Sequence, residues 1–162
     1  MLAHNAPDRR MNLEKLFASF KRKSPSVRAH YYRNHEPESE GIRNFCEGLK
    51  RYGYRVITKL RKDSSPRSDC DLEIATDVMR VALKENPDAI WLISGSSSFT
   101  YLLREIRTHN PRTKIYVVGI TSSTARELRE LADGFFELLE FGEQEGFVTP
   151  LPSRTRTITA SG

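Results

Sequence analysis

Cysteine is scarce in this chain, and long apolar runs are missing from it. Among the 162 residues, the two cysteines, Cys46 and Cys70, match neither a C-x-x-C redox pair nor a zinc-finger pattern. No apolar run approaches the roughly 18 residues that span a bilayer, and residues 1–10 lack the apolar centre of a secretion signal. We therefore expect a cytoplasmic protein in a reducing compartment, without a membrane partner.

Motifs of several common enzyme classes are also missing. The chain has no G-K-[ST], which excludes a Walker phosphate loop, and no G-x-S-x-G, which argues against a serine-hydrolase nucleophile elbow. The four histidines are scattered, so we expect them on the surface or in strands rather than at a metal: they are His4, His30, His35 and His109.

Basic residues outnumber acidic ones. The formal net charge is +5 and the sequence pI is near 9.4. Lys and Arg release condensed counterions from phosphates, which makes polyanions candidate partners. The basic residues are spread through the predicted helices and loops, however, so a solvated basic surface is an equal alternative.

Helical and extended patterns alternate along the chain. Apolar stripes with helical spacing predict helices over residues 11–23, 38–52, 68–85, 99–109 and 124–132. Apolar or β-branched runs predict strands over residues 27–33, 55–60, 89–93, 114–120 and 135–141. This alternation predicts an α/β fold, a doubly wound parallel sheet in a three-layer sandwich. We expect the domain over residues 11–141, a polar segment over residues 1–10, and a disordered tail or linker over residues 142–162.

The predicted strand over residues 89–93 is the centre of this pattern. Its five apolar residues do not alternate with polar ones, which is typical of a strand buried on both faces. A polar loop follows at its carboxyl end, where open α/β folds bind ligands: Ser94, Gly95, Ser96, Ser97 and Ser98. Two interpretations stay open: the loop binds a phosphate in a crevice, or it only turns the chain and caps the next helix.

Asp71 is the most informative charged residue. On a helical wheel it falls inside the apolar arc of the helix predicted over residues 68–85, and Asp77 falls at the edge of that arc. An inward-facing aspartate near a helix N-terminus is explained either by capping of backbone N–H groups or by metal ligation.

Four segments of the chain are similar to a known family. They read R-S-D-C-D-L-E-I-A-T-D over residues 67–77, A-I-W-L-I-S-G-S-S-S-F over 89–99, K-I-Y-V-V-G-I over 114–120 and R-E-L-R-E-L-A-D-G-F-F-E-L over 126–138. Over about residues 11–141 the chain resembles the NYN domain, in particular its LabA-like branch within the PIN nuclease superfamily. The resemblance implies a PIN-like fold with aspartates at the carboxyl ends of the central strands, which hold Mg²⁺ or Mn²⁺ for RNA hydrolysis.

The chain departs from the family at most of these acidic positions. Asp71 and Asp77 match family aspartates, which implies both as catalytic residues and Asp71 as a metal ligand. The family's S-G-D-S-D-F falls on residues 94–99, so Ser96 and Ser98 replace two aspartates. The family's opening strand, which ends in an aspartate and an asparagine, has no counterpart. An apolar strand encoded upstream of Met1 would supply both missing parts.

These departures predict a degenerate metal site. A neutral hydroxyl adds no charge to offset the cost of dehydrating a cation, so we expect weak metal binding and little or no catalysis. The preferred interpretation is a PIN-like domain that acts in RNA or partner binding. One alternative is an active Mg²⁺- or Mn²⁺-dependent ribonuclease, and another is a protein-interaction scaffold. Without the opening strand, the sheet must close directly between residues 27–33 and 89–93 or expose apolar edges, for which a homodimer is one remedy.

Overall fold

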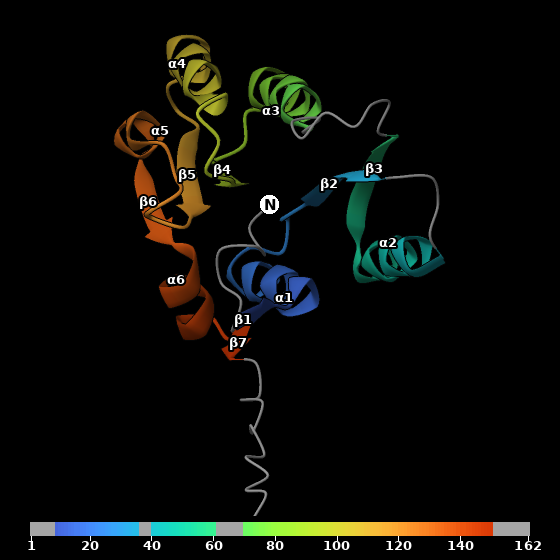
Figure 1. The fold of residues 1–162 in the computed structure, drawn as a ribbon. Helices are drawn as coiled ribbons and strands as arrows, with labels where there is room; N and C mark the ends of the chain where they lie inside the picture. The colour runs from blue at the N-terminus through green and yellow to red at the C-terminus, as the bar shows by residue number, and fades with distance from the viewer. Residues whose placement is uncertain (1–8, 36–39, 61–69, 151–162) are drawn as a thin grey trace, which may run out of the picture.

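The computed structural model describes residues 9–35, 40–60 and 70–150 (Figure 1). The helices in these ranges are α1 (Leu13–Lys23), α2 (Glu40–Tyr52), α3 (Asp71–Glu85), α4 (Phe99–His109), α5 (Arg126–Leu131) and α6 (Leu138–Gln144). The strands are β1 (Arg9–Met11), β2 (Ala29–His35), β3 (Tyr54–Leu60), β4 (Ala89–Ile93), β5 (Lys114–Gly119), β6 (Gly134–Glu137) and β7 (Val148–Pro150). None of the helices described combines the length and apolarity needed to cross a bilayer.

The parallel strands form two sheets rather than one. β2 pairs with β3, and β4, β5 and β6 pair in that order. β1 pairs antiparallel with β7 in a separate ladder. Among the described residues β2 and β4 share no ladder, so the sheet does not close directly between them. Of the two arrangements expected without an opening strand, direct closure is therefore wrong.

Helices cover both faces of the larger sheet. On one face α3, α4 and α5 pack against β4 and β5; the buried members of this core cluster are Ala82, Leu92, Phe99, Leu102, Leu103, Ile106, Ile115, Val117 and Leu128. On the other face α1 and α6 form a second cluster with buried members Leu16, Val118, Ile120, Leu138, Phe147 and Val148. The structure confirms the predicted α/β three-layer sandwich.

Helix α1 joins the two parallel sheets. Its Leu13 packs in the second cluster and also in a third cluster, which α2 forms against β2 and β3. The third cluster is built around the buried side chains of Phe17, Leu49 and Tyr54. One face of the β2–β3 ribbon therefore lies on α1 and α2. Side chains of the ribbon also reach α3: Tyr32 bonds to Asp77, and Lys59 pairs with Glu73.

Strand β4 has the residue bounds and the two-sided packing that the sequence predicts. Ile90 and Leu92 pack with α3 and α4, whereas Trp91 and Ile93 pack with α1 and α6. Only Leu92 is fully buried, and the other four residues are half-buried. The residual exposure fits a strand that is paired on one side only within the described part of the chain.

The region after β6 differs from the prediction. The strand expected over residues 135–141 ends at Glu137, and α6 follows. The Glu137 carboxylate starts that helix by accepting hydrogen bonds from the backbone N–H groups of Leu139 and Glu140. Packed structure continues beyond the expected end of the domain, because Phe147 and Val148 are buried. Residues 151–162 of the expected tail and residues 1–8 of the N-terminal segment lie outside the described residues.

Candidate functional site

Asp71 and the loop after β4 meet at the carboxyl edge of the larger sheet. Asp71 is the first residue of α3, and Ser96 lies between β4 and α4. The Ser96 hydroxyl donates a hydrogen bond to Asp71 Oδ2 at 2.7 Å. The structure thus brings together Asp71 and the serine loop, the two candidate sites predicted from the sequence. The contact between them joins one carboxylate to one neutral hydroxyl.

The serines of the loop bond mainly to one another. The backbone N–H of Ser96 donates to Ser94 Oγ, and the backbone N–H of Ser98 donates to Ser96 Oγ, both at 3.3 Å. Ser98 is the N-cap of α4 but makes no side-chain capping bond. Ser97 and Ser98 are exposed. The N–H groups of Ser96 and Ser98 thus each have a partner inside the loop.

Gly95 fixes this loop against the loop that follows β5. Its carbonyl accepts a hydrogen bond from the Ala125 N–H at 3.1 Å. A Cβ at Gly95 would lie only 3.0 Å from the Ser123 carbonyl oxygen and from Thr124 Oγ1. A side chain at this position would therefore push the two loops apart.

Two residues at this edge were not identified from the sequence. Asn34 lies near the end of β2, and its Oδ1 accepts a hydrogen bond from the Cys70 thiol at 3.0 Å. Cys70 is buried and directly precedes Asp71. The signal was available for Asn34, because a polar residue directly after the strand predicted over residues 27–33 falls at the carboxyl edge of a parallel sheet. Nothing in the sequence indicates its contact with Cys70.

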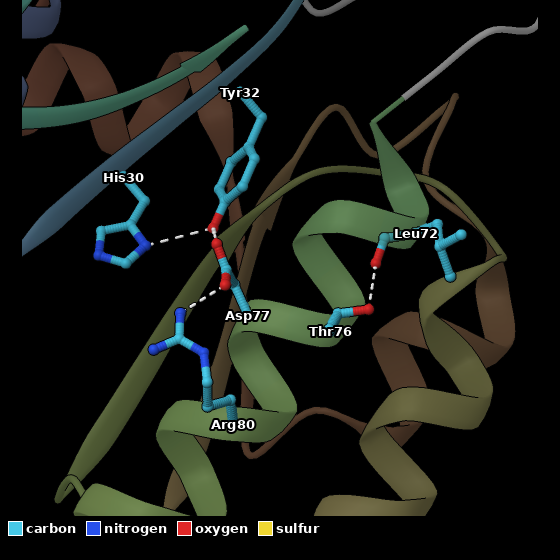
Figure 2. Close-up of polar contacts among 6 residues, drawn as sticks. All are labelled: His30, Tyr32, Leu72, Thr76, Asp77 and Arg80. Atoms are coloured by element: carbon cyan, nitrogen blue, oxygen red, sulfur yellow. Dashed lines mark hydrogen bonds and ion pairs between the residues drawn. The ribbon is translucent and has the colours of Figure 1, made fainter. Parts of the chain in front are cut away.

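Asp77 lies in a different environment from Asp71. It is six residues further along α3, about 9 Å along the helix axis. Its Oδ2 accepts a hydrogen bond from the Tyr32 hydroxyl at 2.8 Å, and Arg80 donates to its Oδ1. Figure 2 shows these contacts on the side of α3 that faces β2, away from Leu72. The structure does not join Asp77 to the serine loop.

Charges and burial set the protonation states around Asp77. The hydrogen bond from Arg80 holds the pKa of Asp77 below its usual value, so the carboxylate is ionised at neutral pH. Burial, followed by the hydrogen bond to Asp77, raises the pKa of Tyr32. Burial and the charge of Arg55 lower the pKa of His30, which lies next to Tyr32. Asp77 is therefore an anion held between a phenol and a guanidinium.

The comparisons with known proteins assign the family. A model of the NYN domain matches residues 2–139. The chain belongs to the NYN-domain family. Its fold is consistent with the PIN-like superfamily in which that domain is placed. No curated protein sequence matches the chain.

One solved structure supports the fold of this NYN domain. A crystal structure of a protein of unknown function from Vibrio parahaemolyticus RIMD 2210633 aligns with a TM-score of 0.71 and 23% identity, over 83% of this chain and 82% of that one. A histidine kinase ThkA in complex with the response regulator TrrA aligns at 16% identity over 74% of this chain and 98% of that one. Its TM-score of 0.35 is too low to carry an argument.

The described residues of this NYN domain do not form the cluster of carboxylates that a divalent cation of the family would need. In the part of the chain that the structure describes, no three His, Cys, Asp or Glu side chains lie close enough to share a metal ion. Asp71 has a hydroxyl beside it in place of a second carboxylate, and that hydroxyl uses its proton on Asp71. Mg²⁺ and Mn²⁺ depend on anionic oxygens to offset their dehydration, and here one carboxylate would face the cation nearly alone.

Replacing Asp77 by Asn is expected to destabilise the NYN domain. The change removes the negative charge that Arg80 and Tyr32 share, and a hydrogen bond to a charged group contributes about 1.5–3 kcal/mol to the free energy of unfolding. Since the pKa of Asp77 is lower in the folded state, this contribution is complete above the usual Asp pKa of about 3.9 and is lost as the pH falls through the folded value.

Urea unfolding at pH 7 and at pH 3 measures this difference. We expect Asp77→Asn to be less stable than the wild type at pH 7 and the difference to be smaller at pH 3, below the usual Asp pKa. Asp88→Asn removes the same charge from an exposed residue and serves as the control. Equal stability of Asp77→Asn and the wild type at pH 7 would show that Asp77 does not anchor α3 to β2.

Proposed function

We propose that this NYN domain, which the sequence places nearest the LabA-like branch, binds single-stranded RNA without hydrolysing it. The observation that supports this most strongly is the hydrogen bond from Ser96 to Asp71. At this position, where the resemblance implies a second aspartate, a neutral donor contacts the one carboxylate. Loss of a single electrostatic stabiliser commonly costs about 10²–10³ in rate, so loss of several is expected to remove hydrolysis.

Family and charge together support RNA as the partner. The NYN domain belongs with nucleases, and a site that has lost its acids can keep the surface that receives the nucleic acid. The net charge of +5 favours a polyanion. Loss of carboxylates also removes a source of repulsion between the site and phosphates.

RNA binding and cleavage can be measured on the same samples. We expect a labelled single-stranded RNA to bind with an affinity that falls steeply with salt, by about 0.7 powers of ten per tenfold rise in salt for each phosphate contacted. The affinity should be the same with and without Mn²⁺, and the RNA should stay intact. Failure to bind at low salt would overturn the proposal and favour a protein-interaction scaffold.

Substitution of Asp71 tests the alternative that the domain is an active ribonuclease. If the domain hydrolyses RNA with Mg²⁺ or Mn²⁺, cleavage should depend on the one carboxylate at the carboxyl edge. Asp71→Asn would then remove cleavage, while Asp88→Asn would leave it unchanged. Metal-dependent cleavage with this pattern would contradict the proposed function.

A further inference from the structure

The interface between β2 and α3 is polar along its length. β2 and α3 run in opposite directions, so successive side chains on this face of β2 meet positions progressively nearer the start of α3. Arg28, just before β2, forms an ion pair with Glu85 at the end of α3. Further along, Tyr32 bonds to Asp77, and Asn34 accepts from Cys70, the residue that precedes α3. Each of these contacts is a matched donor and acceptor.

His30 lies on β2 between Arg28 and Tyr32, and none of the described carboxylates forms a hydrogen bond or ion pair with it. In the parallel ladder His30 lies opposite Arg55 of β3, so both side chains are on the face that α3 covers. The charges that act on His30 are those of Arg55, Arg28 and Arg80, against the carboxylates of Asp77 and Glu85, which pair with Arg80 and Arg28 and leave Arg55 unbalanced. Positive charge is therefore in excess around this imidazole.

The arginines around His30 retain unused donors. Arg28 is paired with Glu85, and Arg80 uses one guanidinium nitrogen on Asp77. None of the described carboxylates forms an ion pair with Arg55, which is exposed. The Arg80 side chain is 39% exposed, so solvent reaches its remaining N–H groups. A guanidinium has five N–H donors in a planar fork, a geometry that suits phosphate oxygens.

The hydrogen bonds fix which nitrogen of His30 is available. The one hydroxyl hydrogen of Tyr32 goes to the Asp77 carboxylate, which can only accept. The Tyr32 oxygen must therefore accept from His30 Nδ1, 3.2 Å away, so Nδ1 carries a hydrogen. Figure 2 shows the second ring nitrogen of His30 turned away from Tyr32. When protonated, this Nε2 is a further donor next to Arg55 and Arg80.

We propose that His30, Arg55 and Arg80 form a binding site for a phosphate group at the junction of β2, β3 and α3. The phosphate supplies a negative charge to the part of the β2–α3 interface around His30. Its oxygens accept hydrogen bonds from the guanidinium of Arg55, the free N–H groups of Arg80 and Nε2 of His30. Two sources share this chemistry: a phosphate of an RNA chain and a free phosphate. The RNA source rests on the proposed function, whereas the free-phosphate source does not.

Titration with inorganic phosphate tests the site directly. We expect saturable binding by calorimetry, with shifts of the side-chain NMR signals of His30, Arg55 and Arg80. Arg55→Gln should weaken phosphate binding about tenfold, since a hydrogen bond to a charged group is worth one to two powers of ten. Arg43→Gln removes the same charge from exposed α2, on the opposite face of the ribbon, and should leave binding unchanged. If both variants weakened phosphate binding equally, the effect would come from net charge rather than from a specific contact, and the proposed site would be wrong.

The pH dependence of anion binding gives a second readout. Sulfate is a suitable probe because its charge is constant between pH 5 and pH 8. The groups that face His30 are Arg28, Arg55, Arg80, Tyr32, Asp77 and Glu85, and of these none is expected to titrate in that range. Sulfate should therefore bind more tightly as the pH falls and His30 becomes protonated, and His30→Gln should remove this dependence. A dependence that persists in His30→Gln would exclude His30 from the site.

An RNA arm separates this proposal from the proposed function. If Arg55→Gln weakens both phosphate and single-stranded RNA binding, the site holds a phosphate of the RNA chain. If phosphate binds at Arg55 and RNA does not bind at all, the phosphate site stands and the proposed function fails. If RNA binds equally to the wild type and Arg55→Gln and phosphate does not bind, the proposed function stands and the phosphate site fails.

Discussion

Replacing Ser96 and Ser98 together by Asp is expected to give this NYN domain a Mn²⁺ site beside Asp71. The Ser96 oxygen already lies 2.7 Å from Asp71 Oδ2, so a carboxylate at position 96 reaches a cation that Asp71 also binds. We expect the affinity for Mn²⁺ to rise by about a hundredfold, since one charge contact near a protein surface is worth several kcal/mol and each tenfold step is about 1.4 kcal/mol. Cleavage of single-stranded RNA should appear with Mn²⁺ if the restored acids suffice.

Two measurements separate a metal site from a simple change of charge. Calorimetry gives the Mn²⁺ affinity, and thermal unfolding with and without Mn²⁺ shows whether the folded state binds the ion. Without metal the double variant should be less stable, because three carboxylates repel one another. Ser97→Asp adds a charge at the exposed middle of the same loop and is the matched control. No gain in Mn²⁺ affinity over that control would mean that the loop only turns the chain.

Replacing Gly142 by Ala is expected to destabilise the fold strongly. Gly142 lies in α6, and a Cβ at this position would lie 2.8 Å from Val148 Cβ and 2.9 Å from the Phe147 ring. Both neighbours are buried in the core cluster that α1 and α6 share, so neither can move aside cheaply. We expect the free energy of unfolding to fall by about 3 kcal/mol, which lowers the unfolding temperature by about 10 °C.

A second helical glycine provides the matched control. Gly41 is in α2, and a Cβ there would meet no heavy atom within 4 Å. Gly41→Ala should therefore leave stability unchanged or raise it by up to about 1 kcal/mol, because alanine restricts the unfolded chain and favours the helix. Thermal and urea unfolding of the two variants measure the contrast. If Gly142→Ala were as stable as Gly41→Ala, α6 would not pack tightly on the segment before β7.

Elements with strong local signals were predicted to the residue. The apolar run of β4 and the apolar stripe of α4 have the expected bounds, because Asn-Pro dipeptides precede the strand and follow the helix and the periodic residues fill the space between them. The helix α6 was missed because its apolar and acidic residues suit a strand equally well. Only the packing of Leu138 and Phe147 against α1, together with the cap at Glu137, selects a helix.

The candidate site divides in the same way. The alternation of strands and helices placed the serine loop at the carboxyl edge of a parallel sheet, and the resemblance to the NYN domain implied Asp71 at the same edge. The sequence could not predict the partner of Asp77. A helical wheel gives the direction in which a side chain leaves the helix, but not which residue of the folded protein lies there. Tyr32, some 45 positions away in the chain, decides where that carboxylate binds.

By itself, the sequence determined the family, the α/β layering and the absence of two acids, because residue identity and local periodicity are properties of the chain alone. A serine carries no charge in any fold, so the prediction of a weak metal site rests on residue identity alone. Tertiary structure decided the rest: which donor the Asp71 carboxylate meets, where Asp77 is anchored, and the gathering of His30, Arg55 and Arg80. These contacts join residues far apart in the chain. The packing of β2 against β3 and α3 places His30 opposite Arg55 and Tyr32 beside Asp77, and the packing of α3 beside the loop after β4 joins Asp71 to Ser96.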